Sequence, residues 1–261
     1  MTRPLAGLVV VVTRPARQSS RFIGLLQECG AAALAFPTIA IEPVSLDAAA
    51  RATLAGGPCD WVVYTSANAV EHSLAQFGRT GPAKTAAIGR ATARALEAAG
   101  IRVDAVPAAG ADSEGLLAHP EFAKPAGRRI LIVKGVGGRD ALRAGLESRG
   151  AIVSLAEVYR RVPAVPAAGA IEELRRACTA GSVAIAVTSV EVLESLLALA
   201  PESHVPGLRS ASLLVPGERV AAAARRLGWR GEIVVARSAE DDAMLEALLA
   251  RQAGDGAPLP A

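Results

Sequence analysis

Two turns of this chain carry the same pair of hydroxyl side chains. Thr65-Ser66 begins the segment TSANAVEHSL, and Thr188-Ser189 begins TSVEVLESLL. Each pair follows an aliphatic run typical of a buried strand and precedes a helical pattern. Helix N-termini offer unpaired N–H groups to anions, whereas serine and threonine at this place can also serve only as N-caps. The pattern indicates either two helix N-caps or a set of hydrogen-bond donors for an anionic ligand.

Other turns of the same kind supply further candidate donors and positive charge. Gly89 and Thr92 follow one aliphatic run, and Gly217 follows another. If these turns face a shared cleft, they would bind one sizeable anionic ligand. The basic side chains that would add charge there are Arg14, Lys134, Arg139 and Arg219.

Tyr159 stands in the strand-like segment SLAEVYRRV. Alternation along a strand puts Tyr159 and Arg161 on one face, with Val158 and Arg160 on the other. The tyrosine either packs at a hinge or offers a phenolic donor to a cleft.

Several familiar chemistries have no pattern to support them. The turn from Gly135 to Asp140 loosely resembles a dinucleotide fingerprint but has Asp140 at the third glycine, and no GxxxxGK[ST] motif occurs. The three cysteines and three histidines are scattered, so neither a disulfide framework nor a metal site is expected. We therefore expect no cofactor and no metal, and a nucleotide-using α/β enzyme is a weak alternative.

The elements that must position these residues recur as two homologous series. Strand-like runs alternate with helical patterns throughout, which predicts an α/β fold with mostly parallel sheets. Four strand-turn-helix units occur twice in the same order, with the Thr-Ser and glycine turns at corresponding places. The pairs begin at Leu8 and Arg129, at Asp60 and Ser182, at Thr85 and Ser212, and at Ile101 and Gly231.

Two proline-bounded apolar segments interrupt this repeat, Ala33 to Val44 and Ser154 to Val165. Proline removes a donor from a sheet ladder, so we expect these segments to connect two lobes.

Composition limits the possible partners. The 261 residues suffice for two modest domains, the net charge is +3, and aromatics make up only 3% of the chain. A stacking platform for nucleic acid is therefore not expected. No run is long enough to cross a bilayer, and no secretory signal is recognised, so we expect a cytoplasmic protein without membrane or nucleic-acid partners.

With these residues in view, the chain resembles the uroporphyrinogen-III synthase family from about Leu8 to Leu249. No single motif is specific, but their order and spacing are similar to the family's. The motifs are VTRP (Val12 to Pro15), FPTIAIEP (Phe36 to Pro43), YTSANAV (Tyr64 to Val70), IGRATARAL (Ile88 to Leu96), SEGLL (Ser113 to Leu117), VYRR (Val158 to Arg161) and VTS (Val187 to Ser189).

The resemblance implies two Rossmann-like, doubly wound lobes joined by a two-stranded β-ladder. One lobe would comprise residues 1–35 plus 164–261, and the other residues 44–153. Residues 36–43 and 154–163 would be the connector strands.

The resemblance also implies a lyase of tetrapyrrole and heme biosynthesis, which cyclises hydroxymethylbilane to uroporphyrinogen III with inversion of ring D and loss of water. Tyr159 would donate a hydrogen bond to the leaving hydroxyl. The protein would be a monomer that contacts the preceding pathway enzyme transiently. The expected contacts to substrate carboxylates, mostly through backbone amides, are Ser66, Gly89, Thr92, Ser113, Thr188, Ser189 and Gly217.

One alternative from another class uses the same cleft without catalysis. A two-lobed binding or regulatory protein for an anionic metabolite would need the same donors. The isomer of uroporphyrinogen that forms distinguishes the two.

Overall fold

The computed structural model describes residues 3–55, 59–81, 83–108, 112–138 and 140–255. The chain divides into two compact units: unit 1 is Met1–Ala40 with Val162–Ala261, and unit 2 is Ile41–Arg161. Unit 2 is therefore one continuous segment inserted into unit 1. The chain leaves unit 1 in strand β3 (Ile39–Pro43) and returns to it in strand β7 (Ile152–Pro163).

Unit 1 is built on a five-stranded sheet in the order β10-β9-β8-β1-β2, in which the neighbouring strands are parallel. Aliphatic β1 lies at a central position between β8 and β2, so three of its four side chains are buried. The elements are β1 (Val9–Val12), η1 (Ala16–Gln18), α1 (Ser20–Glu28), β2 (Ala32–Ala35), α7 (Ala170–Thr179), β8 (Val183–Ala186), α8 (Val190–Leu199), α9 (Val205–Leu208), β9 (Ser212–Val215), α10 (Glu218–Arg226), β10 (Ile233–Val235) and α11 (Asp241–Asp255).

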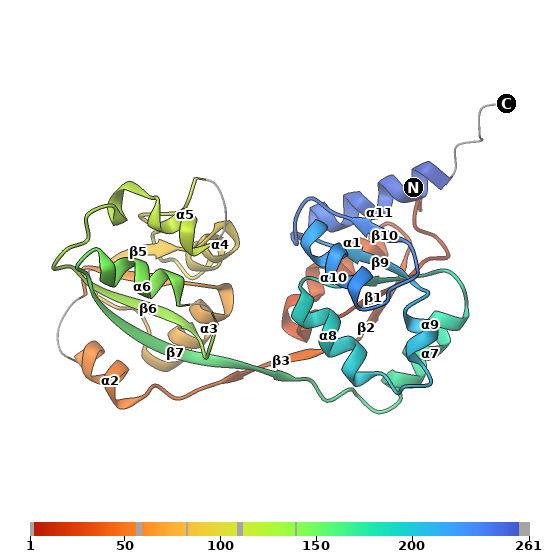
Figure 1. The fold of residues 1–261 in the computed structure, drawn as a ribbon, viewed down its shortest axis with the longest axis horizontal. Coiled ribbons are helices and arrows are strands. Elements are labelled where there is room, and N and C mark those ends of the chain that lie inside the picture. Colours follow the sequence, from red (N-terminus) through yellow and green to blue (C-terminus); the bar gives the residue numbers. More distant parts are fainter. Residues whose placement is uncertain (1–2, 56–58, 82, 109–111, 139, 256–261) are drawn as a thin grey trace. The chain divides into compact units, whose positions relative to one another are not determined.

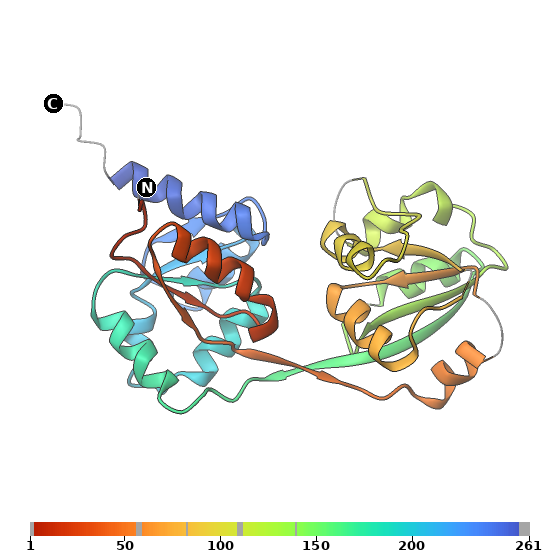
Figure 2. The same ribbon diagram turned by 180° about the vertical axis from the view of Figure 1, so that it is seen from behind.

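Helices α1 and α11 lie side by side in unit 1, although they come from opposite ends of the chain (Figure 1). Figure 2 shows the same pairing from behind. Phe22 and Leu26 of α1 and Met244 and Leu248 of α11 are fully buried in one core cluster with Val10 of β1. Burial of these apolar side chains joins α1 and α11 into one folding unit.

Unit 2 contains a second five-stranded sheet in the order β3-β7-β6-β4-β5. The pairs β7-β6, β6-β4 and β4-β5 are parallel. The remaining elements of this unit are α2 (Ala48–Ala55), β4 (Trp61–Tyr64), α3 (Ala67–Phe77), β5 (Lys84–Ala87), α4 (Arg90–Ala98), α5 (Ser113–Leu117), η2 (Pro120–Phe122), β6 (Arg129–Gly135) and α6 (Ala141–Ser148).

Alternate residues of the central strands in unit 2 enter two different core clusters. Val62 and Tyr64 of β4 pack with residues of α3 and α4. Trp61 and Val63 pack with residues of α5, η2 and α6. Because successive side chains of a strand point to opposite faces, helices cover both faces of this sheet. The prediction of an α/β fold with parallel-rich sheets is confirmed.

The segment expected as a connector strand at 154–163 lies mostly within the sheet of unit 2. Ser154 to Glu157 pair with β6, and β7 already begins at Ile152. Proline does not interrupt this pairing because Pro163 is the last residue of the strand.

Candidate functional site

A cavity of about 300 Å³ lies in unit 2, at the carboxyl ends of β4 and β6, beside β7 and near the starts of α5 and α6. Ligands of parallel α/β sheets bind at such carboxyl ends. The described residues that line it are Thr65, Ile88, Asp112, Ser113, Ile132, Lys134, Gly135, Val136, Gly137, Gly138, Asp140, Leu142, Arg143, Leu155, Tyr159 and Arg161. Among the site residues predicted from the sequence, Ser113, Lys134 and Tyr159 belong to this lining.

Tyr159 reaches across the sheet to the end of a strand that is not its neighbour. It lies on β7, and Ser66 follows β4, while β6 runs between these two strands. The phenolic oxygen of Tyr159 is nevertheless 3.0 Å from Oγ of Ser66. The structure therefore brings together two predicted residues that are 93 positions apart.

Gly135, at the end of β6, leaves space for the Tyr159 side chain to extend toward Ser66. The register shifts between Lys134 and Gly135, so that Lys134 pairs with Glu157 but Gly135 pairs with Tyr159. A Cβ atom on residue 135 would lie 2.6 Å from Cζ of the tyrosine, closer than side-chain carbons come in folded proteins. A β-bulge commonly redirects a side chain near a functional site, and a glycine here leaves space for the ring.

The ring of Tyr159 is also held by His72 of α3. The two ring centroids are 5.8 Å apart with planes 25° from parallel, which is a stacked arrangement. Only 3% of Tyr159 is exposed. On the same strand, the guanidinium carbon of Arg161 lies 6.0 Å from the tyrosine ring centre. These contacts fix the direction of the phenol more tightly than its single hydroxyl contact could.

Lys134 supplies a positive charge to the cavity. It is the last residue but one of β6, only 9% of it is exposed, and its Nζ lies 3.5 Å from a carboxylate oxygen of Asp140. The Asp140 side chain is 66% exposed, so this ion pair is weak and solvent-screened. A buried ammonium with a loose partner can bind a carboxylate of a ligand.

Ser66 and Ser189 are helix N-caps in both halves of the repeat. Oγ of Ser66 accepts a hydrogen bond from the amide of Ala69 at 3.0 Å, and Oγ of Ser189 accepts one from Val192 at 3.2 Å. Capping by these side chains stabilises α3 and α8. The N-cap interpretation of the Thr-Ser turns is therefore correct for the serine side chains.

The glycine turns leave helix N-termini without a side-chain cap. Gly89 precedes α4 and Gly217 precedes α10, and neither helix start receives a side-chain hydrogen bond at its N-cap. The first N–H groups of such helices are available to an anion. Gly217 has a φ of 154°, which disfavours other residues there.

Other predicted contacts are placed less favourably or lie outside the described residues. The side chain of Thr92 is buried inside α4 with 3% of the residue exposed, so only its backbone could reach a ligand. Thr188 is half-buried before α8, and Arg219 is exposed on α10. Arg139 lies outside the described residues.

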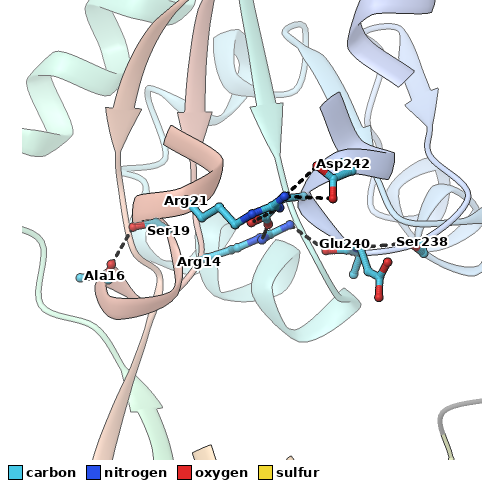
Figure 3. Close-up of polar contacts among 9 residues, drawn as sticks. Arg14, Ala16, Ser19, Arg21, Ser238, Glu240 and Asp242 are labelled. Carbon is cyan, nitrogen blue, oxygen red and sulfur yellow. Dashed lines mark hydrogen bonds and ion pairs between the residues drawn. The ribbon is translucent and has the colours of Figure 1, made fainter. Parts of the chain in front are cut away.

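Arg14 was expected to add charge at a ligand site, but its guanidinium is occupied within unit 1. It pairs with Asp241, donates to the carbonyl oxygen of Ala239 at 2.8 Å, and lies 5.1 Å from the ring centre of Phe22. Figure 3 shows Arg14 and Arg21 pointing together toward the start of α11. Arg21 also contacts Asp241 at 3.2 Å. Arg14 therefore holds α11 against the N-terminal segment.

Within the described ranges, no group of three or more histidine, cysteine, aspartate or glutamate side chains could hold a metal ion. No helix there is long and apolar enough to span a bilayer. The described charged side chains that line the cavity are Lys134, Arg143 and Arg161, together with Asp112 and Asp140.

The sequence model described as "Uroporphyrinogen-III synthase HemD" matches residues 20–246. The chain belongs to the uroporphyrinogen-III synthase family. Uroporphyrinogen-III synthase of Salmonella typhimurium strain LT2 is 38% identical over 250 residues, which cover 92% of this chain and 99% of that protein. Uroporphyrinogen-III synthase of Escherichia coli strain K12 is 36% identical over 246 residues, with the same coverage of 92% and 99%.

Solved structures of uroporphyrinogen-III synthases are also similar. A mutant of the Thermus thermophilus enzyme has 25% sequence identity and a TM-score of 0.58, over 95% of this chain and 100% of that one. The Helicobacter pylori protein, at 15% identity and a TM-score of 0.62 over 94% and 99%, supports the fold alone. The predicted family resemblance is confirmed.

Two residues of this uroporphyrinogen-III synthase family member contribute to the site without having been singled out for it. His72 is one of three scattered histidines, and no signal in the sequence relates it to Tyr159. Gly135 was noted only within a failed glycine fingerprint. The signal that could have found Gly135 is its place at the end of an aliphatic strand, where a glycine often marks a close approach.

Proposed function

We propose that this chain is a cyclising hydro-lyase that converts hydroxymethylbilane to uroporphyrinogen III, with inversion of ring D and loss of water. Membership of the uroporphyrinogen-III synthase family supports this reaction. The observation that carries it in the structure is the phenol of Tyr159, which lines a cavity that also holds the ammonium of Lys134.

The substrate supplies much of the driving force for this reaction. A pyrrole nitrogen of the linear tetrapyrrole expels the terminal hydroxyl group and leaves an azafulvene cation. Tyr159 assists by donating a hydrogen bond to that hydroxyl and giving it the phenolic proton as the C–O bond breaks, so that it departs as water. The proton released on ring closure restores the phenol. Such assistance by a positioned acid accelerates a reaction without a strong base elsewhere in the site.

Ring D must then be attacked at its substituted carbon. The spiro intermediate fragments and recloses with ring D inverted, whereas closure without enzyme gives isomer I. Selectivity therefore depends on holding one reactive conformer and excluding its competitor.

The eight carboxylates of the substrate give the protein many points at which to hold that conformer. In unit 2, we assign this task to Lys134, Ser113 and the N–H groups of α4 behind Gly89. In unit 1, we assign it to the turn at Gly217, with Arg219, and to the N–H groups at the Thr188-Ser189 turn that the side chain of Ser189 does not cap. Free backbone N–H groups at helix starts suit carboxylates because the helix dipole adds positive potential there.

We also infer a cytoplasmic monomer that receives its unstable substrate through transient contact with the preceding enzyme. The modest net charge and the absence of a membrane-spanning helix among the described residues are consistent with this setting.

The decisive experiment supplies freshly generated hydroxymethylbilane, oxidises the products, and separates isomers I and III by chromatography. We expect isomer III to predominate with folded protein and isomer I to predominate without it. An isomer ratio equal to that of the enzyme-free control would contradict the proposed function. A protein that binds the substrate but leaves that ratio unchanged would be a binding protein.

A further inference from the structure

The hydroxyl of Ser66 has more than a capping contact. Its oxygen accepts the amide hydrogen of Ala69 at 3.0 Å and lies 3.0 Å from the phenolic oxygen of Tyr159. A serine hydroxyl has one proton to donate and two lone pairs. After capping α3, Ser66 keeps its proton and one lone pair for the contact with Tyr159.

Two arrangements of protons satisfy this geometry, since either atom can be the donor. If Tyr159 donates to Ser66, its one phenolic proton is used in that hydrogen bond and is not available to a ligand in the cavity. If Ser66 donates to Tyr159, the phenolic proton remains for the cavity. Tyr159 lines that cavity, whereas Ser66 is not among the described residues that do.

The second arrangement also forms a continuous chain of donors. The amide of Ala69 donates to Ser66, Ser66 donates to Tyr159, and Tyr159 donates into the cavity. Hydrogen bonds in series polarise one another, so the last donor becomes stronger. The N-terminal end of α3 contributes a positive potential at the start of the chain.

Ser189 shows that a capping serine does not by itself create such a chain. It occupies the corresponding turn of the repeat and caps α8 through Val192 at 3.2 Å. Both tyrosines of the sequence, Tyr64 and Tyr159, belong to unit 2, so Ser189 has no phenol to contact within its own unit. Of the two capping serines, Ser66 is therefore the one that shares its unit with a tyrosine partner.

We propose that Ser66 is a positioning residue that donates its hydroxyl proton to Tyr159 and so directs the phenolic proton into the cavity. This inference rests on the proposed function. It changes the role expected for the Ser66 side chain, which acts through Tyr159 rather than on a substrate carboxylate. The stacked ring of His72 and the missing side chain of Gly135 hold the phenol in the required place.

The test is a double-mutant cycle on kcat and KM for formation of isomer III. We expect Tyr159→Phe to lower kcat about 10- to 100-fold, at the low end for a general acid. Ser66→Ala should lower kcat about 5- to 20-fold, a size typical of the coupling between residues in direct contact. KM should change little, because Ser66 acts on Tyr159 and not on the substrate. In the Tyr159→Phe background, Ser66→Ala should have no further effect on kcat.

Further variants separate the hydroxyl from the cap. Ser66→Gly removes the hydroxyl but keeps most of the N-cap preference, so it replaces Ser66→Ala if that variant does not fold. Ser66→Thr keeps both the hydroxyl and the N-cap, because threonine is also a good N-cap. This variant should therefore have a kcat within about threefold of wild type. Asp47→Ala is the matched control, since Asp47 accepts from Ala50 at 2.7 Å and caps α2 of the same unit. It should lower stability and leave kcat unchanged.

Equal slowing by Ser66→Ala in the wild-type and Tyr159→Phe backgrounds would overturn the inference. A change in KM alone would also overturn it, because that result indicates direct contact with the substrate. If wild-type protein produces the enzyme-free isomer ratio, the proposed function itself fails and this inference fails with it.

Discussion

The backbone of Gly135 lies so close to Tyr159 that a Cβ atom on residue 135 would be 2.6 Å from Cζ of the ring. The proximity follows from the strand order, because the tyrosine side chain passes the end of β6 to reach Ser66 beyond it. A single methyl group at this place therefore competes directly with the phenol.

We expect Gly135→Ala to displace the ring of Tyr159 and lower kcat about tenfold, because small misplacements of catalytic groups are costly. Overpacking should reduce the free energy of unfolding by about 1–3 kcal/mol. Urea unfolding and the isomer III assay measure the two effects. Gly24→Ala is the control, since its Cβ would meet nothing within 4 Å and α1 should gain stability. Unchanged kcat in folded Gly135→Ala would show that the ring position is not critical.

Lys134→Met tests the contribution of charge to the cavity. We expect KM for the anionic substrate to rise roughly tenfold at low ionic strength and to depend less on added salt, because screened attraction is lost. The folded state should tolerate the change, since methionine fills similar apolar space. Lys124→Met removes an exposed lysine of the same unit and should leave KM unchanged. A salt dependence equal to that of wild type would exclude Lys134 as a substrate contact.

The pairing of Arg14 with Asp241 predicts a structural cost when it is broken. Both side chains are largely buried, with 11% and 13% exposed. Asp241→Asn should lower the free energy of unfolding by about 2 kcal/mol, because it weakens charged hydrogen bonds to Arg14 and Arg21. Urea unfolding at several salt concentrations measures this. Glu172→Gln, which breaks an exposed pair with Arg175 at 2.6 Å, should have a much smaller effect. Equal effects would mean that burial adds nothing to the Arg14 contact.

The thiol of Cys178 should react slowly in the folded protein. Burial raises its pKa to about 11, so the reactive thiolate is scarce at pH 8. Alkylation with iodoacetamide at pH 8, followed by peptide mass spectrometry, should modify Cys178 much faster in guanidinium-unfolded protein than in native protein. Equal rates in the two states would contradict the protected position of this thiol in unit 1.

Much of the fold was predictable because it depends on local patterns. Aliphatic runs and glycine stops mark the strands and helices, and the duplicated Thr-Ser turns mark Ser66 and Ser189 as helix starts. These signals extend over only a few residues and are repeated, so each half supports the interpretation of the other.

The contacts of the site were less predictable because they depend on strand order. Nothing within SLAEVYRRV reveals that Tyr159 passes Gly135 to reach Ser66. Arg14 illustrates the same limit, since its partner Asp241 is 227 positions away. Acidic residues in the first turn of a helix are favoured by the helix dipole, so the sequence offers no reason to pair Asp241 with a distant arginine. Only the tertiary structure distinguishes a guanidinium that is free to bind ligands from one that holds a helix.

The insertion of unit 2 into unit 1 has a consequence for synthesis on the ribosome. Strand β1 leaves the ribosome before unit 2, but its neighbour β8 follows only after all of unit 2 has been translated. At typical elongation rates this delay is roughly 10 to 30 s. Unit 2 can fold during that interval. The four consecutive valines of β1 then have β2 as a neighbour but not yet β8. We therefore expect unit 2 to complete its folding on the ribosome before unit 1.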